Sequence, residues 1–215
     1  MEILSTTGGI AITNCFVIAD EKSGEAVLFD APDHTVATLL DEVENRGWKL
    51  KGLWLTHGHF DHLADHKIVT DRFPEVEVLI HALDEPMLLQ PGSRMFQLPF
   101  TIPPGKADAL VADNQKLKIG SIDVLALHTP GHSPGHVAFH LPGENVLVGG
   151  DLIIGGSVGR TDLPGADARK FAQSLRRITN LPKETRLLPG HGDESTIGDE
   201  LATNAYLHEF LRMAT

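Results

Sequence analysis

The segment HGHFDH, which begins at His57, contains side chains that can bind metal ions. An apolar, strand-like run is followed directly by four candidate ligands, His57, His59, Asp61 and His62. In an extended segment, side chains at positions i and i+2 lie on one face, so His57 and His59 can converge on one point. The following turn can aim Asp61 and His62 at a second point. A polar loop could carry any one of these residues, but four of them beside a glycine favour a metal site.

Three further ligand-type residues follow strand-like segments later in the chain, namely His132, Asp151 and His191. Each of them directly follows a glycine, which allows a sharp backbone turn. In an α/β sandwich, successive strand ends gather at one edge of the sheets. We therefore expect these residues to meet the HGHFDH segment in space.

The donor set contains five histidines and two aspartates and no thiolate, which suits zinc, manganese or iron better than monovalent copper. Seven ligands are too many for one tetrahedral zinc, but they suit two divalent metal ions that share a carboxylate and a water. We expect one metal on His57, His59 and His132, a second on Asp61, His62 and His191, and Asp151 as the bridge. Asp30 ends another strand-like segment, where it would either accept a hydrogen bond from a ligand imidazole or serve as a turn residue.

The elements that must position these residues alternate between strands and helices. Strand patterns cover residues 11–18, 26–29, 53–55, 76–81, 122–127, 136–141, 146–149 and 186–188. Helices are predicted after Asp33 as cap, from His62 to about Phe73, from Asp167, and as one last helix after a capping box at Thr196. The pattern predicts one α/β domain over residues 1–215.

The segment 88–118 is the least regular part of the chain and is rich in proline. Phe96 and Phe100 within it look exposed, and the segment is either a flap that brings them to a substrate or a surface loop. Among the other histidines, His66 is expected on a helix surface and His81 near the site. Strand positions in the core or at its rim are expected for His128, His136 and His140.

Composition excludes several classes of protein. The 215 residues include 18 Lys and Arg against 29 Asp and Glu, a formal net charge of −11, so neither nucleic acid nor an anionic membrane is an expected partner. No apolar stretch approaches the roughly 20 residues of a membrane helix, and the N-terminus lacks a signal-peptide pattern. Cys15 is a single cysteine, so we expect a reducing compartment, by default the cytoplasm. The sequence leaves the oligomeric state open.

The pattern THGHFDH, followed by His132, Asp151 and His191, resembles the metallo-β-lactamase fold superfamily. The resemblance extends from the hairpin before Asp30 to His191. It implies a four-layer αβ/βα sandwich, which neither composition nor periodicity would have indicated. The motif is specific for the fold and says little about the substrate.

Further stretches resemble the short bacterial glyoxalase II-like hydrolases: GRTDLPG at 159–165, LPGHG at 188–192 and TIG at 196–198. That resemblance implies a thioesterase for S-lactoylglutathione or a related small-molecule thioester, in which a metal-bridging hydroxide attacks the carbonyl. Asp61 and Asp151 would be the catalytic carboxylates and Arg160 a substrate-binding residue, unless the Arg160 loop is exposed and self-paired. Residues 192–215 suffice for one helix, whereas long glyoxalase II enzymes add a helical domain that helps hold glutathione, so recognition of glutathione is expected to be weak.

A second family shares part of this pattern. A similar GRTD stretch occurs in the persulfide dioxygenases, which hold a single iron at positions that match His57, His132 and Asp151. A mononuclear iron dioxygenase is therefore the alternative to the dinuclear hydrolase. Lactonases and nucleases of the same fold are further alternatives, and the complete set of ligands disfavours a metal-binding module without activity.

Overall fold

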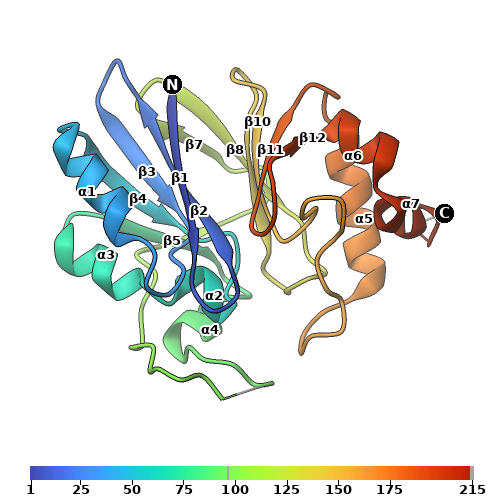
Figure 1. Ribbon diagram of the computed structural model, residues 1–215, viewed down its shortest axis with the longest axis horizontal. Coiled ribbons are helices and arrows are strands. Elements are labelled where there is room, and N and C mark those ends of the chain that lie inside the picture. The colour runs from blue at the N-terminus through green and yellow to red at the C-terminus, as the bar shows by residue number, and fades with distance from the viewer. Residues whose placement is uncertain (96, 214–215) are drawn as a thin grey trace.

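Two six-stranded sheets form the inner layers of the molecule (Figure 1). The computed structural model describes residues 1–95 and 97–213. In the first sheet the strands follow chain order: β1 (Glu2–Gly8), β2 (Thr13–Asp20), β3 (Glu25–Phe29), β4 (Lys49–Trp54), β5 (Glu77–His81) and β6 (Ala109–Val111). The order in the second sheet is β12 (Ser195–Thr196), β11 (Arg186–Pro189), β10 (Val146–Gly150), β9 (Val137–Leu141), β8 (Ile122–His128) and β7 (Lys116–Ile119).

Helices cover the outer face of each sheet, which gives the predicted four-layer αβ/βα sandwich (Figure 1). On the side of the first sheet lie α1 (Ala37–Asn45), α2 (Phe60–Leu63), α3 (His66–Arg72) and α4 (Glu85–Leu89). On the side of the second sheet lie α5 (Ala168–Thr179), α6 (Ile197–Thr203) and α7 (Ala205–Met213). Among the described residues, no helix is both long and apolar enough to cross a membrane.

Alternation of side chains along the strands separates the core into layers. In β2, Cys15 and Val17 pack with the helices of the first half, whereas Phe16 and Ile18 face the second sheet. A third apolar layer lies between the second sheet and α5, α6 and α7. Because both faces of the sheets are covered, every residue of β2 is buried.

Most predicted elements are present, with shifted ends. The predicted hairpin is formed by β2 and β3, which pair antiparallel with Phe16 opposite Phe29. The predicted helix cap at Asp33 is wrong, because the Asp33 carboxylate accepts from the backbone N–H of Ile10 and α1 begins without a side-chain cap. The predicted helix from His62 is divided into α2 and α3, and the single last helix is two helices, α6 and α7.

Two expectations about exposure are also wrong. His66 is buried, with its Nδ1 2.8 Å from the Leu63 carbonyl, and does not lie on a helix surface. Phe100 is half-buried against the helical core of the first half, and its ring centroid lies 5.6 Å from that of His34. Phe96 lies outside the described residues. Part of the segment 88–118 is regular, since it contains β6 and the first residues of β7.

The strand ends carry the candidate ligands to one edge of both sheets. β10 and β11 pair in parallel, so Asp151 and His191 leave the second sheet at the same edge. An isolated bridge between Thr13 and His191 joins this edge to the start of β2 in the first sheet. Gly150 has φ of +51°, and a Cβ there would lie 2.5 Å from the His136 Nε2 atom, so the turn into Asp151 requires glycine.

Phe139 should be a main support of the contact between the sheets. It is fully buried, and its ring centroid lies 5.4 Å from that of Phe29 and 5.5 Å from that of Trp54. Phe139→Ala is expected to lower the free energy of unfolding by about 3–5 kcal/mol in urea denaturation. The exposed Ile68→Ala should change it by less than about 0.5 kcal/mol. Equal effects of the two substitutions would contradict this packing.

Candidate metal centre

The structure brings all seven candidate ligands into one cluster. Three groups each offer one ligand atom per residue, with all of these atoms within 4.8 Å of one another: His57, His59 and His132; His57, His62 and Asp151; and Asp61, His62 and His191. The groups overlap at His57 and His62. The Asp151 Oδ2 atom also lies 3.4 Å from the Nε2 atoms of both His132 and His191. Asp151 therefore stands between the other ligands.

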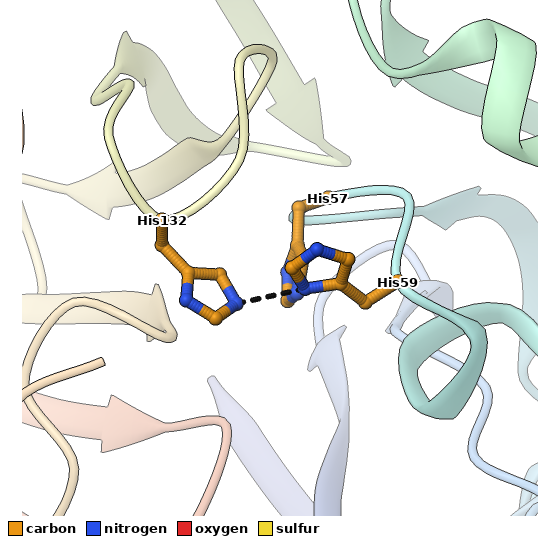
Figure 2. A group of neighbouring side chains, drawn as sticks. All are labelled: His57, His59 and His132. Carbon is orange, nitrogen blue, oxygen red and sulfur yellow. Dashed lines mark hydrogen bonds between the residues drawn. The ribbon is translucent and has the colours of Figure 1, made fainter. Parts of the chain in front are cut away.

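The first group unites the two halves of the molecule. His57 and His59 lie between β4 and α2, and His132 approaches them from the loop between β8 and β9 (Figure 2). The His59 Nδ1 and His132 Nε2 atoms are 2.8 Å apart. Burial, together with the neighbouring His132, lowers the pKa of His59 to about 4. His59 is therefore neutral at pH 7 and can offer a lone pair to a metal.

The group of Asp61, His62 and His191, called the second group from here on, lies beside β2. Asp61 and His62 are carried by α2, and His191 follows β11. The Asp61 Oδ2 atom lies 3.5 Å from His62 Nε2 and 3.4 Å from His191 Nε2, and it accepts a 3.0 Å hydrogen bond from the Thr13 hydroxyl. A carboxylate oxygen and two imidazole nitrogens thus face one point.

Several potential metal-ligand atoms are buried without a hydrogen-bond partner. His57 Nε2, His62 Nε2 and Asp151 Oδ1 make no hydrogen bond among the described residues. Buried polar atoms are normally paired, because leaving them unpaired is costly. Imidazole nitrogens and carboxylate oxygens that converge in this way fit divalent metal ions, which such atoms bind well.

A shared network fixes the orientation of His57 and His62. The Thr56 hydroxyl donates to Asp30 Oδ2 at 2.8 Å, so it can only accept from His57 Nδ1 at 3.0 Å. Asp30 Oδ2 also lies 2.8 Å from His62 Nδ1, which therefore carries the proton. In both imidazoles the Nε2 atom is left to face the cluster. The structure thus places Asp30 against an imidazole of the cluster, the first of the two positions considered for it.

Backbone carbonyl groups orient two further imidazoles. His132 Nδ1 lies 2.9 Å from the Arg160 carbonyl oxygen, and His191 Nδ1 lies 3.2 Å from the Ile12 carbonyl oxygen. Since a carbonyl only accepts, both Nδ1 atoms carry protons and both Nε2 atoms face the cluster. The Arg160 side chain is 60% exposed and pairs with Asp162 at 2.9 Å. The backbone of the Arg160 loop therefore contacts the cluster, whereas the Arg160 guanidinium pairs with Asp162 of the same loop.

His136 belongs to this network although the sequence pattern suggested an ordinary strand histidine. It is fully buried, its Nε2 accepts a 3.0 Å hydrogen bond from the Asp151 backbone N–H, and its Nδ1 lies 2.9 Å from the Thr129 hydroxyl. Burial lowers its pKa well below the ordinary value, so it is neutral. The one signal in the sequence is that Gly-His at 135–136 repeats Gly-His at 131–132.

His81, expected near the site, stacks on His128 with ring centroids 4.1 Å apart. Within residues 1–95 and 97–213, neither of these two histidines joins a group of candidate ligands. His140 is buried, as expected for a strand position.

The ligand side chains shift the pKa values of one another. Burial raises the pKa of Asp61, but His62 and a hydrogen bond from His191 outweigh it and bring the pKa to about 2. Burial also raises the pKa of Asp151, yet the same two imidazoles hold it well below its ordinary value. Burial lowers the pKa of His191, but hydrogen bonds with Asp151 and Asp61 raise it to about 10. In the metal-free protein at pH 7, both carboxylates are ionised and His191 is protonated.

Comparison with known proteins assigns the family. Residues 8–191 match the Metallo-beta-lactamase superfamily. The chain belongs to this superfamily. Together with the cluster of histidine and aspartate side chains, membership supports a metal-dependent hydrolase.

Proteins similar to this chain have names that refer to different activities. It is 31% identical over 202 residues to hydroxyacylglutathione hydrolase GloC of Haemophilus influenzae, over 91% of this chain and 92% of the relative. The structure of BLEG-1 B3 metallo-beta-lactamase superposes with a TM-score of 0.88 at 33% identity, over 96% of this chain and 99% of that one. Di-iron-bound TTHA1623 gives a TM-score of 0.84 at 35% identity, over 94% and 99% of the two chains. ETHE1 from Myxococcus xanthus, with a TM-score of 0.79 at 22% identity over 100% and 92%, shares the fold.

The raised pKa of His191 predicts that metal uptake releases protons. Because that pKa is about 10, the imidazole is protonated at pH 7.5, and its proton must leave before the nitrogen can bind a metal. Zinc added to metal-free protein in weak buffer should release at least about one proton more per chain than zinc added to His191→Ala, measured with an indicator dye. Metal affinity should accordingly fall as the pH falls below 10. Equal proton release by both proteins would contradict the assignment.

Proposed function

We propose that the chain is a dinuclear metal hydrolase that cleaves acyl thioesters such as S-lactoylglutathione. The observation that carries the proposal is the position of Asp151 between two groups of converging donor atoms. His57, His59 and His132 would hold the first metal, and Asp61, His62 and His191 the second. Asp151 reaches both groups, through His132 at 3.4 Å and His62 at 3.3 Å, so it would bridge the two ions.

The chain supplies charge and orientation for this chemistry. When bound, divalent metal ions lower the pKa of water and polarise a carbonyl oxygen. The ionised Asp61 and Asp151 would offset the charge of bound cations, and Asp30 and Thr56 hold two imidazoles with their Nε2 atoms toward the cluster. Cys15 is not a candidate nucleophile, because it is buried and burial raises the pKa of its thiol.

The thioester substrate is supported by the relative GloC, whose name describes hydrolysis of hydroxyacylglutathione, and by the sequence GRTDLPG at 159–165. The hydrogen bond from His132 to the Arg160 carbonyl places this stretch beside the cluster. We propose that the Arg160 guanidinium contacts the substrate after leaving Asp162. Zinc is the proposed metal, and the di-iron form of TTHA1623 makes iron the other candidate.

We propose a single domain over residues 1–215 that acts in the cytoplasm on a small molecule, without nucleic acid or membrane as a partner. The alternative of a persulfide dioxygenase requires one iron on His57, His132 and Asp151. The second group of donors, Asp61, His62 and His191, favours the dinuclear hydrolase over that alternative.

The bridging position predicts that Asp151 is needed more than Asp61. Asp151→Ala would disturb both metals, whereas Asp61→Ala would disturb the second alone and leave a partly active enzyme. Asp151→Ala should therefore lower kcat/KM for a thioester at least about tenfold more than Asp61→Ala, a difference of about 1.4 kcal/mol in transition-state stabilisation. Both variants are assayed after metal reconstitution, with bound metal measured in the same samples. Comparable residual rates would contradict the bridging role.

The substrate is tested with a panel of acyl thioesters, a β-lactam and a persulfide. We expect turnover of S-lactoylglutathione with a high KM, because a formal net charge of −11 disfavours binding of an anionic substrate. Weak ground-state binding raises KM and spares kcat. Absence of turnover of every thioester would overturn the proposal, and a micromolar KM for the glutathione thioester would contradict the expected weak recognition. Oxygen uptake with the persulfide would favour the dioxygenase.

Arg160→Ala is expected to raise KM further and to change kcat little. The substitution keeps the backbone carbonyl that accepts from His132, so it removes the guanidinium alone. The matched control is Arg186→Ala, which removes another surface arginine paired with an acidic residue, Glu194. Equal KM values for the two variants would contradict a substrate role for Arg160.

A further inference from the structure

Asp84, which immediately precedes α4, is a fully buried carboxylate outside the groups of candidate ligands. Its Oδ1 atom accepts a 2.6 Å hydrogen bond from the backbone N–H of Gly135. Its Oδ2 atom accepts from the backbone N–H of Gly58 at 3.0 Å and from the Ser133 hydroxyl at 2.5 Å. Both carboxylate oxygens are thus engaged by donors from two separate loops.

These donors lie next to the first group of ligands. Gly58 stands between His57 and His59, and Ser133 directly follows His132. His57 and His59 belong to the loop after β4 of the first sheet, and His132 belongs to the loop between β8 and β9 of the second sheet. Asp84 therefore connects the two loops that Figure 2 shows facing each other.

The glycines at these positions are explained by how closely Asp84 approaches. A Cβ at Gly135 would lie 2.7 Å from the Asp84 Cγ and backbone N atoms. A Cβ at Gly58 would lie 2.9 Å from the Asp84 carbonyl oxygen and 2.8 Å from the Met87 Cβ. Such contacts are too short for any residue with a side chain. The glycine in HGH and the glycine before His136 thus permit the loops to close on this carboxylate.

We infer that Asp84 is a positioning residue that fixes the distance between the His57–His59 loop and the His132 loop, and so sets the affinity of the first metal position. The inference rests on the ligand groups of the proposed function and not on its substrate. A 2.7 Å backbone hydrogen bond from the N–H of Val137, the first residue of β9, to the Thr56 carbonyl holds the first of these loops one residue before His57. Asp84 accepts from Gly58, one residue after His57, so the backbone is held on both sides of His57.

Asparagine is the sharpest substitution because it keeps the shape and changes the bonding. Asp84 uses both oxygens as acceptors, whereas asparagine has one oxygen and one NH₂ group. In Asp84→Asn, the NH₂ group must face at least one backbone N–H, from Gly58 or Gly135. One loop is therefore pushed away, and metal sites tolerate displacements of only about 0.5 Å.

The chain offers a matched control in Asp20. This aspartate is also buried, and it also accepts from two backbone N–H groups, of Lys22 and Ser121, and from one serine hydroxyl, of Ser23. It lies at the end of β2 opposite to Thr13, which contacts Asp61. Asp20→Asn thus causes the same kind of damage far from the candidate metal centre.

The test is a zinc titration of metal-free protein against a chelator, with the two metal positions separated by background substitutions. In a His191→Ala background, which retains the first group of ligands, Asp84→Asn should lower zinc affinity about 10–100-fold. In a His132→Ala background, which retains Asp61, His62 and His191, it should change zinc affinity less than about threefold. Asp20→Asn should have little effect in either background.

An equal loss of zinc affinity in both backgrounds, or an equal loss caused by Asp20→Asn, would show general destabilisation and would overturn the inference. Unchanged zinc affinity in the His191→Ala background would also overturn it. If Asp84→Asn fails to fold, Ser133→Ala serves as the second variant, because it removes one of the three donors to Asp84. A smaller loss of zinc affinity, confined to the His191→Ala background, is then expected. If Ser133→Ala causes no loss there, the inference is overturned. No substrate enters the titration. If thioester turnover is absent while the selective loss of zinc is present, the proposed function fails and the role of Asp84 stands.

Discussion

The central constraint on this fold is that seven polar side chains from distant strand ends must converge, five of them buried and His59 and His191 half-buried. Burying imidazoles and carboxylates without partners is costly, so each one must be paired or bind a cation. Groups outside the cluster supply hydrogen-bond partners for most of the imidazoles. The Nδ1 atoms of His57, His62, His132 and His191 are engaged by a hydroxyl, a carboxylate or a carbonyl. Their Nε2 atoms are thereby left to face one another across Asp151.

The sandwich serves this arrangement because its two sheets share one edge. Neither half holds a complete set of ligands: His57, His59, Asp61 and His62 come from the first half, and His132, Asp151 and His191 come from the second. The geometry of the candidate site therefore depends on how the halves are held together. Phe139 fixes the sheets through the apolar layer between them, and Asp84 connects the two loops directly at the site.

The sequence predicted those parts of the site that depend on residue type and local spacing. The HGHFDH segment and the strand-end positions of His132, Asp151 and His191 required nothing beyond a short pattern. The strand-end position of Asp30 predicts contact with a ligand imidazole as one of two alternatives. The structure places all of these residues together, while their binding of metals stays a prediction.

What the sequence did not predict depends on partners far along the chain. Asp84 is bonded to residues at least 26 positions away, and no local pattern marks it. His136 accepts from a backbone N–H 15 positions away, and its one signal in the sequence is the repeat of Gly-His. The Ile12 carbonyl that orients His191 has no side-chain signature at all. Asp33 was misassigned as a helix cap for the same reason, since its carboxylate accepts from Ile10 on the hairpin between β1 and β2.

The dinuclear centre is best tested by the number of metal ions that one chain binds. Metal-free protein is titrated with zinc at neutral pH, and bound metal is measured by elemental analysis after removal of the excess. The two proposed metal positions, His57, His59 and His132 and Asp61, His62 and His191, predict two zinc ions per chain in the native sequence and one in His191→Ala. A single tightly bound ion in the native protein, unchanged by loss of His191, would contradict the dinuclear centre.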